Sequence, residues 1–232
     1  MTWIKICGTT NLEDALTAVE AGADALGFVF YEKSPRKIDP ETARKIAEKL
    51  PPNIETVGVF VDQTAEQIRA IVEHVGLSAV QLYDQERIEA LSSHYELASA
   101  TNKRRPKIIF VVPGNDLADA GGIYLKSACF MISKSFRNIL FALLVDSSIA
   151  EKPGGTGTRF DWIRSRGIIA GMNEFCPTIV AGGLDPGNVA GALALLHNPW
   201  GVDVASGVEA RPGKKDPEKV RAFINAARKA EK

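Results

Sequence analysis

Two residues suited to proton transfer, Cys7 and Asp146, follow apolar runs that have the composition of buried strands. Cys7 ends the run Trp3–Cys7, and Asp146 directly follows Leu140–Val145. A thiolate can accept a proton and a carboxyl group can donate one. Lys5 lies two positions before Cys7, on the same face of an extended strand, so its ammonium group would favour the thiolate. The alternatives are a small buried apolar side chain for Cys7 and a helix cap or loop acceptor for Asp146.

A further carboxylate, that of Asp203, lies inside an apolar run between Val202 and Val204. A charged group at such a position is costly unless it is paired. Lys5 is a plausible partner, and an ion pair with a purely structural role is an equally good interpretation.

Glycine-containing turns that could hold an anion follow the last two apolar runs. Gly182-Gly183 follows one run and Ser206-Gly207 follows the next. Backbone amides can approach a phosphate closely where no Cβ intervenes, and the start of a following helix adds positive potential. A single glycine pair more often marks a simple turn, but two such turns after consecutive runs favour phosphate. Gly154-Gly155-Thr156-Gly157 is a further candidate.

Arg36 belongs to Ser34-Pro35-Arg36, in the predicted loop after the second apolar run. Most loop arginines are solvated. A planar guanidinium group nevertheless matches the geometry of a substrate carboxylate.

The elements that must position these groups alternate between short apolar runs and alanine-rich amphipathic segments. Runs that are apolar at nearly every position are typical of parallel strands covered on both faces. This alternation predicts an α/β fold, a (β/α)8 TIM barrel that forms a single domain over residues 1–232. An open doubly wound sheet is the alternative, but its usual glycine-rich turn after the first strand is absent. The predicted strands are Trp3–Cys7, Ala25–Phe30, Thr56–Val61, Ala79–Leu82, Lys107–Val112, Leu140–Val145, Thr178–Ala181 and Val202–Ala205.

Capping patterns predict where several helices begin. Each pattern offers a side-chain acceptor to the free amides of a first helical turn, in three cases with proline at the first helical position. They are Asn11 before Glu13 and Asp14, Thr64 with Gln67, Asp39-Pro40, Asp185-Pro186 and Asp216-Pro217. In such a barrel the reacting groups lie at the carboxyl ends of the strands, and phosphate often binds after the seventh and eighth strands.

Composition excludes some classes of protein. Lys+Arg and Asp+Glu both number 28, and this zero net charge argues against a general nucleic-acid binder. Cys7, Cys129 and Cys176 match neither a disulfide framework nor a zinc pattern, which favours a reduced, cytoplasmic setting. We expect no signal peptide and no membrane span, because the first residues lack the required pattern and the apolar runs are short.

Short motifs occur in a fixed order through almost the whole chain. They are Lys5-Ile6-Cys7-Gly8, Gly27-Phe28-Val29-Phe30, Ser34-Pro35-Arg36, Val57-Gly58-Val59-Phe60-Val61, Val80-Gln81-Leu82, Leu144-Val145-Asp146-Ser147, Gly154-Gly155-Thr156-Gly157, Phe160-Asp161-Trp162, Ala181-Gly182-Gly183-Leu184-Asp185-Pro186, Gly201-Val202-Asp203-Val204-Ala205-Ser206-Gly207-Val208-Glu209 and Pro212-Gly213-Lys214-Lys215-Asp216. Their order and spacing resemble the phosphoribosylanthranilate isomerase family.

The resemblance implies an Amadori rearrangement in tryptophan biosynthesis that uses no metal or cofactor. Cys7 would be the general base, Asp146 the general acid, and Arg36 the group that binds the anthranilate carboxylate. The expected small-molecule partner is a phosphorylated aminosugar, with no nucleic acid and no membrane, and the expected assembly is a monomer or homodimer. The remaining residues implied to bind substrate are Gln81, Asp203 for the sugar hydroxyls, and Gly155, Gly182, Gly183, Ser206 and Gly207 for the phosphate.

The chain departs from the family pattern in two places. Tyr83-Asp84 stands where members usually have His-Gly, and the segment from about 115 to 138 is longer than usual. The rival functions are the related isomerase of histidine biosynthesis, indole-glycerol-phosphate synthase, and a barrel that binds a phosphorylated ligand without catalysis. The histidine enzyme pairs aspartates at opposite strand ends, and here the first strand ends in Cys7. The synthase would need a lysine general acid and additional carboxylates. Cys7 and Asp146 together argue against a barrel that only binds its ligand.

Overall fold

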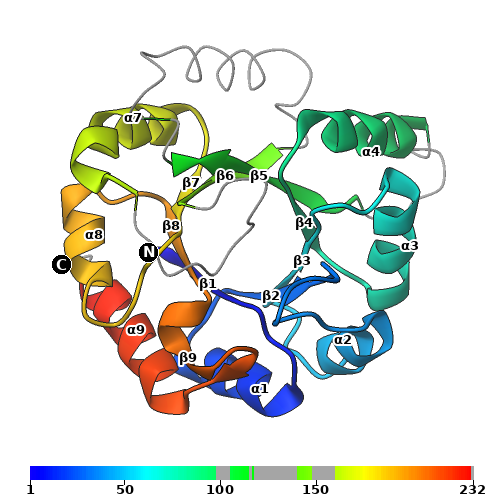
Figure 1. Ribbon diagram of the computed structural model, residues 1–232, viewed down its shortest axis with the longest axis horizontal. Coiled ribbons are helices and arrows are strands. Elements are labelled where there is room, and N and C mark those ends of the chain that lie inside the picture. Colours follow the sequence, from blue (N-terminus) through cyan, green and yellow to red (C-terminus); the bar gives the residue numbers. More distant parts are fainter. Residues whose placement is uncertain (98–104, 115–116, 118–139, 148–159, 231–232) are drawn as a thin grey trace.

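Eight parallel strands, β1 to β8, form a closed barrel in sequence order. The computed structural model of the chain describes residues 1–97, 105–114, 117, 140–147 and 160–230. Figure 1 shows helices packed around the outside of this ring. The predicted (β/α)8 barrel is confirmed, and the predicted strand bounds differ from those observed by a residue or two at most. The strands are β1 (Trp3–Cys7), β2 (Ala25–Val29), β3 (Glu55–Val59), β4 (Ala79–Leu82), β5 (Lys107–Pro113), β6 (Leu140–Asp146), β7 (Thr178–Val180) and β8 (Gly201–Val204).

The helices of the described residues lie on the outer face of the barrel, where they bury the outward-facing apolar side chains of the strands. Within the same residues, no helix combines the length and the apolar character needed to cross a membrane. The helices are α1 (Leu12–Ala21), α2 (Pro40–Ala47), α3 (Ala65–Val75), α4 (Gln85–Leu97), α7 (Trp162–Phe175), α8 (Val189–Leu195) and α9 (Pro217–Lys229).

Most of the predicted helix starts are confirmed. Asn11, Asp39 and Asp216 cap α1, α2 and α9 through their side chains, and Thr64 forms a reciprocal capping box with Gln67 at α3. The predicted start at Asp185-Pro186 is wrong, because α8 begins at Val189.

The Asp185 carboxylate is used within the turn that precedes α8. Its Oδ1 accepts a hydrogen bond from Gly187 N at 2.7 Å, and its Oδ2 accepts one from Asn188 Nδ2 at 2.8 Å. The same pair of residue types that starts α2 therefore closes a turn here.

Side chains of alternate residues on β1 fill the barrel interior in successive layers. Trp3 lies at the amino-terminal end of the barrel, Lys5 in the middle and Cys7 at the carboxyl end, as the two-residue period of a strand requires. The indole of Trp3 stacks on that of Trp200 with centroids 5.2 Å apart, and Phe141 packs edge-on against Trp200. Aromatic rings therefore fill the end of the barrel opposite Cys7.

The segment after β8 packs beside α1. It contains a short 3-10 helix, η2 (Ser206–Val208), followed by a two-stranded antiparallel hairpin of β9 (Glu209–Arg211) and β10 (Lys214–Lys215). Asp14 of α1 accepts a hydrogen bond from the backbone N of Lys215 at 2.7 Å, which ties the hairpin to the barrel.

Candidate active site

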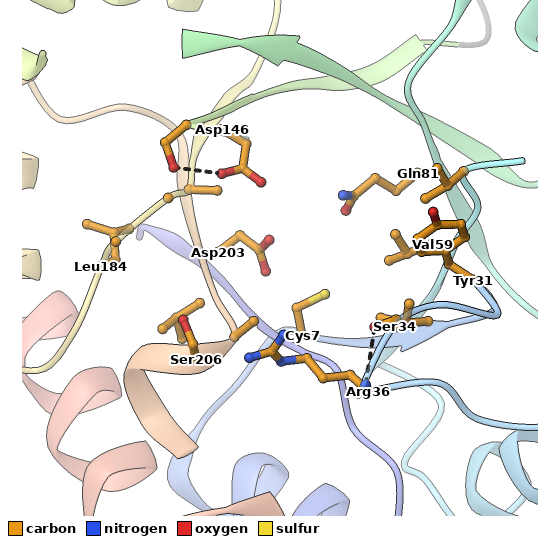
Figure 2. Close-up of a pocket in the computed structure, with 18 of the residues that line it drawn as sticks. Cys7, Tyr31, Ser34, Arg36, Val59, Gln81, Asp146, Leu184, Asp203 and Ser206 are labelled. Atoms are coloured by element: carbon orange, nitrogen blue, oxygen red, sulfur yellow. Dashed lines mark hydrogen bonds between the residues drawn. The ribbon is translucent and has the colours of Figure 1, made fainter. Parts of the chain in front are cut away.

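A pocket opens at the carboxyl ends of the strands, the end that carries the active site in this fold. Figure 2 shows charged and polar side chains pointing into it from several different strands and loops. Most of the residues predicted from the sequence line this one pocket. They are Cys7, Arg36, Gln81, Asp146, Gly182, Gly183, Asp203 and Ser206.

One predicted phosphate-site residue, Gly207, is not among the described residues that line the pocket. Gly207 directly follows Ser206, and a Cβ on it would lie 1.9 Å from the Leu184 carbonyl oxygen. Only glycine therefore lets η2 pack against the loop after β7. Gly155, with the rest of the Gly154–Gly157 motif, lies outside the described residues.

Cys7, the last residue of β1, places its sulfur atom at the floor of the pocket. Gly27 on β2 makes room for it, because a Cβ on Gly27 would lie 2.7 Å from Sγ. Burial raises the pKa of the Cys7 thiol, and Lys5 opposes this change without overcoming it. The sequence predicted that Lys5 favours the thiolate, and Lys5 does act in that direction, but the effect of desolvation on the Cys7 pKa is larger.

Lys5 and Asp203 form an ion pair inside the barrel, beneath Cys7. They are register partners across the β1–β8 seam, and Nζ lies 2.9 Å from Oδ1. Burial acts to lower the pKa of Lys5, but the charges of Asp203 and Cys7 outweigh it and raise that pKa, so the ammonium form is retained. The predicted pairing is confirmed, and Asp203 also lines the pocket.

Asp146 ends β6 and faces the pocket on the side opposite Cys7 (Figure 2). Its side chain is mostly buried, at 8% exposure, and its Oδ1 accepts a long hydrogen bond of 3.4 Å from Ser147 Oγ. Gly182 has a φ of 78°, and a Cβ there would lie 2.4 Å from Ser147 Oγ and 2.9 Å from Asp146 Oδ1. The first glycine of the Gly182-Gly183 turn is therefore needed for the carboxyl group to fit.

Arg36 is buried rather than solvated, with 8% of its surface exposed. Its guanidinium group makes two parallel hydrogen bonds to Glu209, from Nε to Oε1 and from Nη2 to Oε2, both 2.8 Å long. Gly8, with a φ of 76°, lies against the arginine stem, since a Cβ there would meet Arg36 Cδ at 2.6 Å. The glycine that follows Cys7 therefore makes room for the arginine.

Glu209 was missed by sequence reasoning, as was Lys215, whose Nζ lies 3.2 Å from Glu209 Oε1. Both belong to the quoted motifs but had no assigned role. Burial acts to raise the pKa of Glu209, but its contacts with Arg36 and Lys215 outweigh this and lower it, so the group is a carboxylate. Glu209 therefore lies in a buried cluster with Arg36 and Lys215 beside the pocket, in which burial lowers the pKa of Lys215.

Tyr83, one of the departures from the family pattern, also lines the pocket. Gln81 Nε2 donates a hydrogen bond of 3.4 Å to its hydroxyl oxygen. Burial raises the pKa of Tyr83, and the nearby Asp146 and Cys7 add to the shift, so the side chain stays a neutral phenol. Gln81 Oε1 is buried and has no hydrogen-bond partner among the described residues, which leaves an acceptor at the wall of the pocket.

Comparisons with known proteins agree on one family. The family model described as N-(5'phosphoribosyl)anthranilate (PRA) isomerase matches residues 4–226. A curated N-(5'-phosphoribosyl)anthranilate isomerase from Geobacter sp. (strain M21) is 44% identical over 229 residues, covering 99% of each chain. A second, from Thermotoga petrophila, is 41% identical over 228 residues, covering 98% of this chain and 99% of the relative.

Solved structures agree as well. The phosphoribosyl anthranilate isomerase of Thermotoga maritima superposes with a TM-score of 0.79 at 38% identity, covering 99% of this chain and all of that one. A structure of the enzyme in complex with reduced 1-(o-carboxyphenylamino)-1-deoxyribulose 5-phosphate superposes with a TM-score of 0.75 at 36% identity, with the same coverage. The chain therefore belongs to the N-(5'-phosphoribosyl)anthranilate isomerase family.

Proposed function

We propose that Cys7 is the general base and Asp146 the general acid of the isomerisation that this family performs. The chain is a phosphoribosylanthranilate isomerase of tryptophan biosynthesis, which converts an aminoaldose into an aminoketose. The observation that carries the assignment is that the ends of β1 and β6 bring one thiol and one carboxyl group to opposite sides of a single pocket.

The reaction needs one acid and one base in sequence. The Asp146 carboxyl group donates its proton to the furanose ring oxygen, the C1–O bond breaks, and the nitrogen lone pair forms a Schiff base with C1. The Cys7 thiolate then removes the C2 proton, and those C–H electrons form the C1–C2 double bond of an enolamine. Tautomerisation of the enolamine, with the C2 hydroxyl proton lost and a proton gained at C1, yields the ketone.

A raised pKa at Cys7 is compatible with this role. A thiol with a higher pKa is deprotonated in a smaller fraction of molecules, but its thiolate is a stronger base toward carbon. The Lys5 ammonium group beneath the sulfur stabilises the thiolate when it forms. The site therefore combines a strong base with a fixed positive charge.

Arg36 and the Gly182-Gly183 turn both line the pocket, and they suit the two charged ends of the substrate. Arg36 would bind the anthranilate carboxylate, as a guanidinium group does through paired N–H donors. The turns at Gly182-Gly183 and Ser206-Gly207 would bind the phosphate through backbone amides, with the Gly155 segment as a further contributor. Asp203 and Gln81 Oε1 would accept hydrogen bonds from the sugar hydroxyls.

The structure of a relative supports this arrangement, because its bound compound carries a carboxyphenyl group at one end and a phosphate at the other. Residues 1–232 would form one catalytic domain, and the protein would act in the cytoplasm as a monomer or homodimer. One relative, the phosphoribosylanthranilate isomerase of Thermotoga maritima, is described as dimeric and has also been solved as monomers generated from the dimer.

Purified protein mixed with freshly generated N-(5'-phosphoribosyl)anthranilate should make the anthranilate-type fluorescence decay without added metal. Cys7→Ala and Asp146→Asn should each lower turnover by at least about a hundredfold, because a placed acid or base contributes about 10²–10⁴-fold. Binding of phosphorylated product analogues should be largely retained. Near-normal turnover in either variant would remove that residue from the mechanism.

A further inference from the structure

The buried carboxylate of Glu209 lies directly behind Arg36 and does not line the pocket itself. Its two oxygens accept the Nε and Nη2 protons of Arg36, at 2.8 Å each. This side-on contact leaves Nη1 and the outer N–H of Nη2 unused by the hydrogen bonds of the described residues. Those remaining donors form the end-on edge of the guanidinium group, and Arg36 lines the pocket.

Glu209 is held in place from a second direction. Its Oε1 also accepts hydrogen bonds from Lys215 Nζ at 3.2 Å and from Gly213 N at 3.3 Å. Lys215 is in turn fixed by a hydrogen bond from its Nζ to the Ala205 carbonyl oxygen at 3.0 Å. The carboxylate therefore has little freedom to turn, and neither does the guanidinium group attached to it.

The loss of this carboxylate would affect both of its partners. Without Glu209, the Nε and Nη2 donors of Arg36 would lose both of their acceptors, and Lys215 would lose its anionic partner. The guanidinium plane would then be free to turn away from its present orientation.

We propose that Glu209 is a positioning residue that determines specificity for the substrate carboxylate, by turning the end-on edge of Arg36 into the pocket. The inference rests on the proposed role of Arg36 and extends it to a residue that never touches the substrate. It assigns the segment after β8, which carries Glu209 and Lys215, a part in substrate selection.

The test compares two ligands in the wild type and in Glu209→Gln. One ligand is reduced 1-(o-carboxyphenylamino)-1-deoxyribulose 5-phosphate, and the other is the same compound without its carboxylate. Titration calorimetry should show that wild type prefers the first ligand, and that Glu209→Gln lowers this preference by about tenfold to a hundredfold, the range for a hydrogen bond to a charged group. With the natural substrate, KM should rise by a similar factor and kcat should change much less.

Glu48→Gln is the matched control, because Glu48 pairs with Arg44 at 2.9 Å on the exposed face of α2. It should leave both the ligand preference and KM unchanged. If Glu209→Gln weakens both ligands equally, Glu209 has only a structural role and the inference is wrong. An unchanged preference overturns it as well.

Glu209→Asp keeps the charge and retracts it by one methylene, so it should give an intermediate loss of preference. If circular dichroism shows that Glu209→Gln does not fold, the ligand preference of Glu209→Asp tests the inference in its place. A wild type that binds both ligands equally would instead remove the proposed role of Arg36, and a wild type that turns over no substrate would remove the proposed catalytic assignments.

Discussion

Replacing Gly27 by alanine should damage catalysis through a single added methyl group. That Cβ would lie 2.7 Å from Cys7 Sγ, 3.1 Å from Cys7 Cα and 3.2 Å from Lys5 Cε. Non-bonded carbon atoms prefer about 3.5–4.0 Å, so the sulfur must move by roughly 1 Å or β1 and β2 must separate. Overpacking of this kind costs about 1–3 kcal/mol of unfolding free energy, and a displacement of about 1 Å at a reacting group can cost about a hundredfold in rate.

The assay measures kcat from the fluorescence decay and stability from thermal unfolding. Gly27→Ala should lower kcat by about a hundredfold and reduce the unfolding free energy by about 1–3 kcal/mol. Gly171→Ala in α7 is the control, since a Cβ there meets nothing within 4 Å, and it should leave kcat unchanged. If Gly27→Ala keeps more than about a third of the wild-type kcat, the close contact at Cys7 does not govern catalysis.

Two further predictions concern the charges around the base. Because burial raises the pKa of the Cys7 thiol above the ordinary 9.0, its modification by iodoacetamide, which needs only the thiolate and is followed by peptide mass spectrometry, should still be accelerating above about pH 9, and a rate that levels off below about pH 9 contradicts this environment of Cys7. Lys5→Met should reduce the unfolding free energy, measured by chemical denaturation, by about 3–5 kcal/mol, because it leaves the Asp203 carboxylate buried without a cation. Adding Asp203→Asn to this variant should recover part of the lost free energy. If nothing is recovered, the pair contributes nothing to stability.

The fold was predictable because each strand carries its own local signal. Parallel strands buried on both faces are apolar at nearly every position, and the capping residues Asn11, Asp39 and Asp216 give most helix starts away. Asp185-Pro186 is a case in which the capping pattern does not predict the start of a helix. The same dipeptide starts α2, but the Asp185 carboxylate instead accepts hydrogen bonds from Gly187 and Asn188 within a turn. The dipeptide alone does not distinguish these two structures.

The site was predictable only in part, for a different physical reason. A residue at the end of a strand points into the mouth of the barrel wherever the rest of the chain lies, so Cys7 and Asp146 could be found one at a time. The role of Glu209 could not be predicted in this way, because it depends on a contact with Arg36, which is 173 positions away. Similarly, the net pKa shift of Cys7 depends on how completely the folded barrel excludes water from the thiol, which no local pattern records.

The aromatic rings at the amino-terminal end of the barrel make the molecule its own optical probe. Trp3 and Trp200 come from opposite ends of the chain, yet their indoles stack with centroids 5.2 Å apart. This contact exists only when β8 has docked on β1 and completed the ring. Quenching or near-ultraviolet dichroism from the stacked indoles therefore reports the moment of ring closure during refolding, without any attached dye.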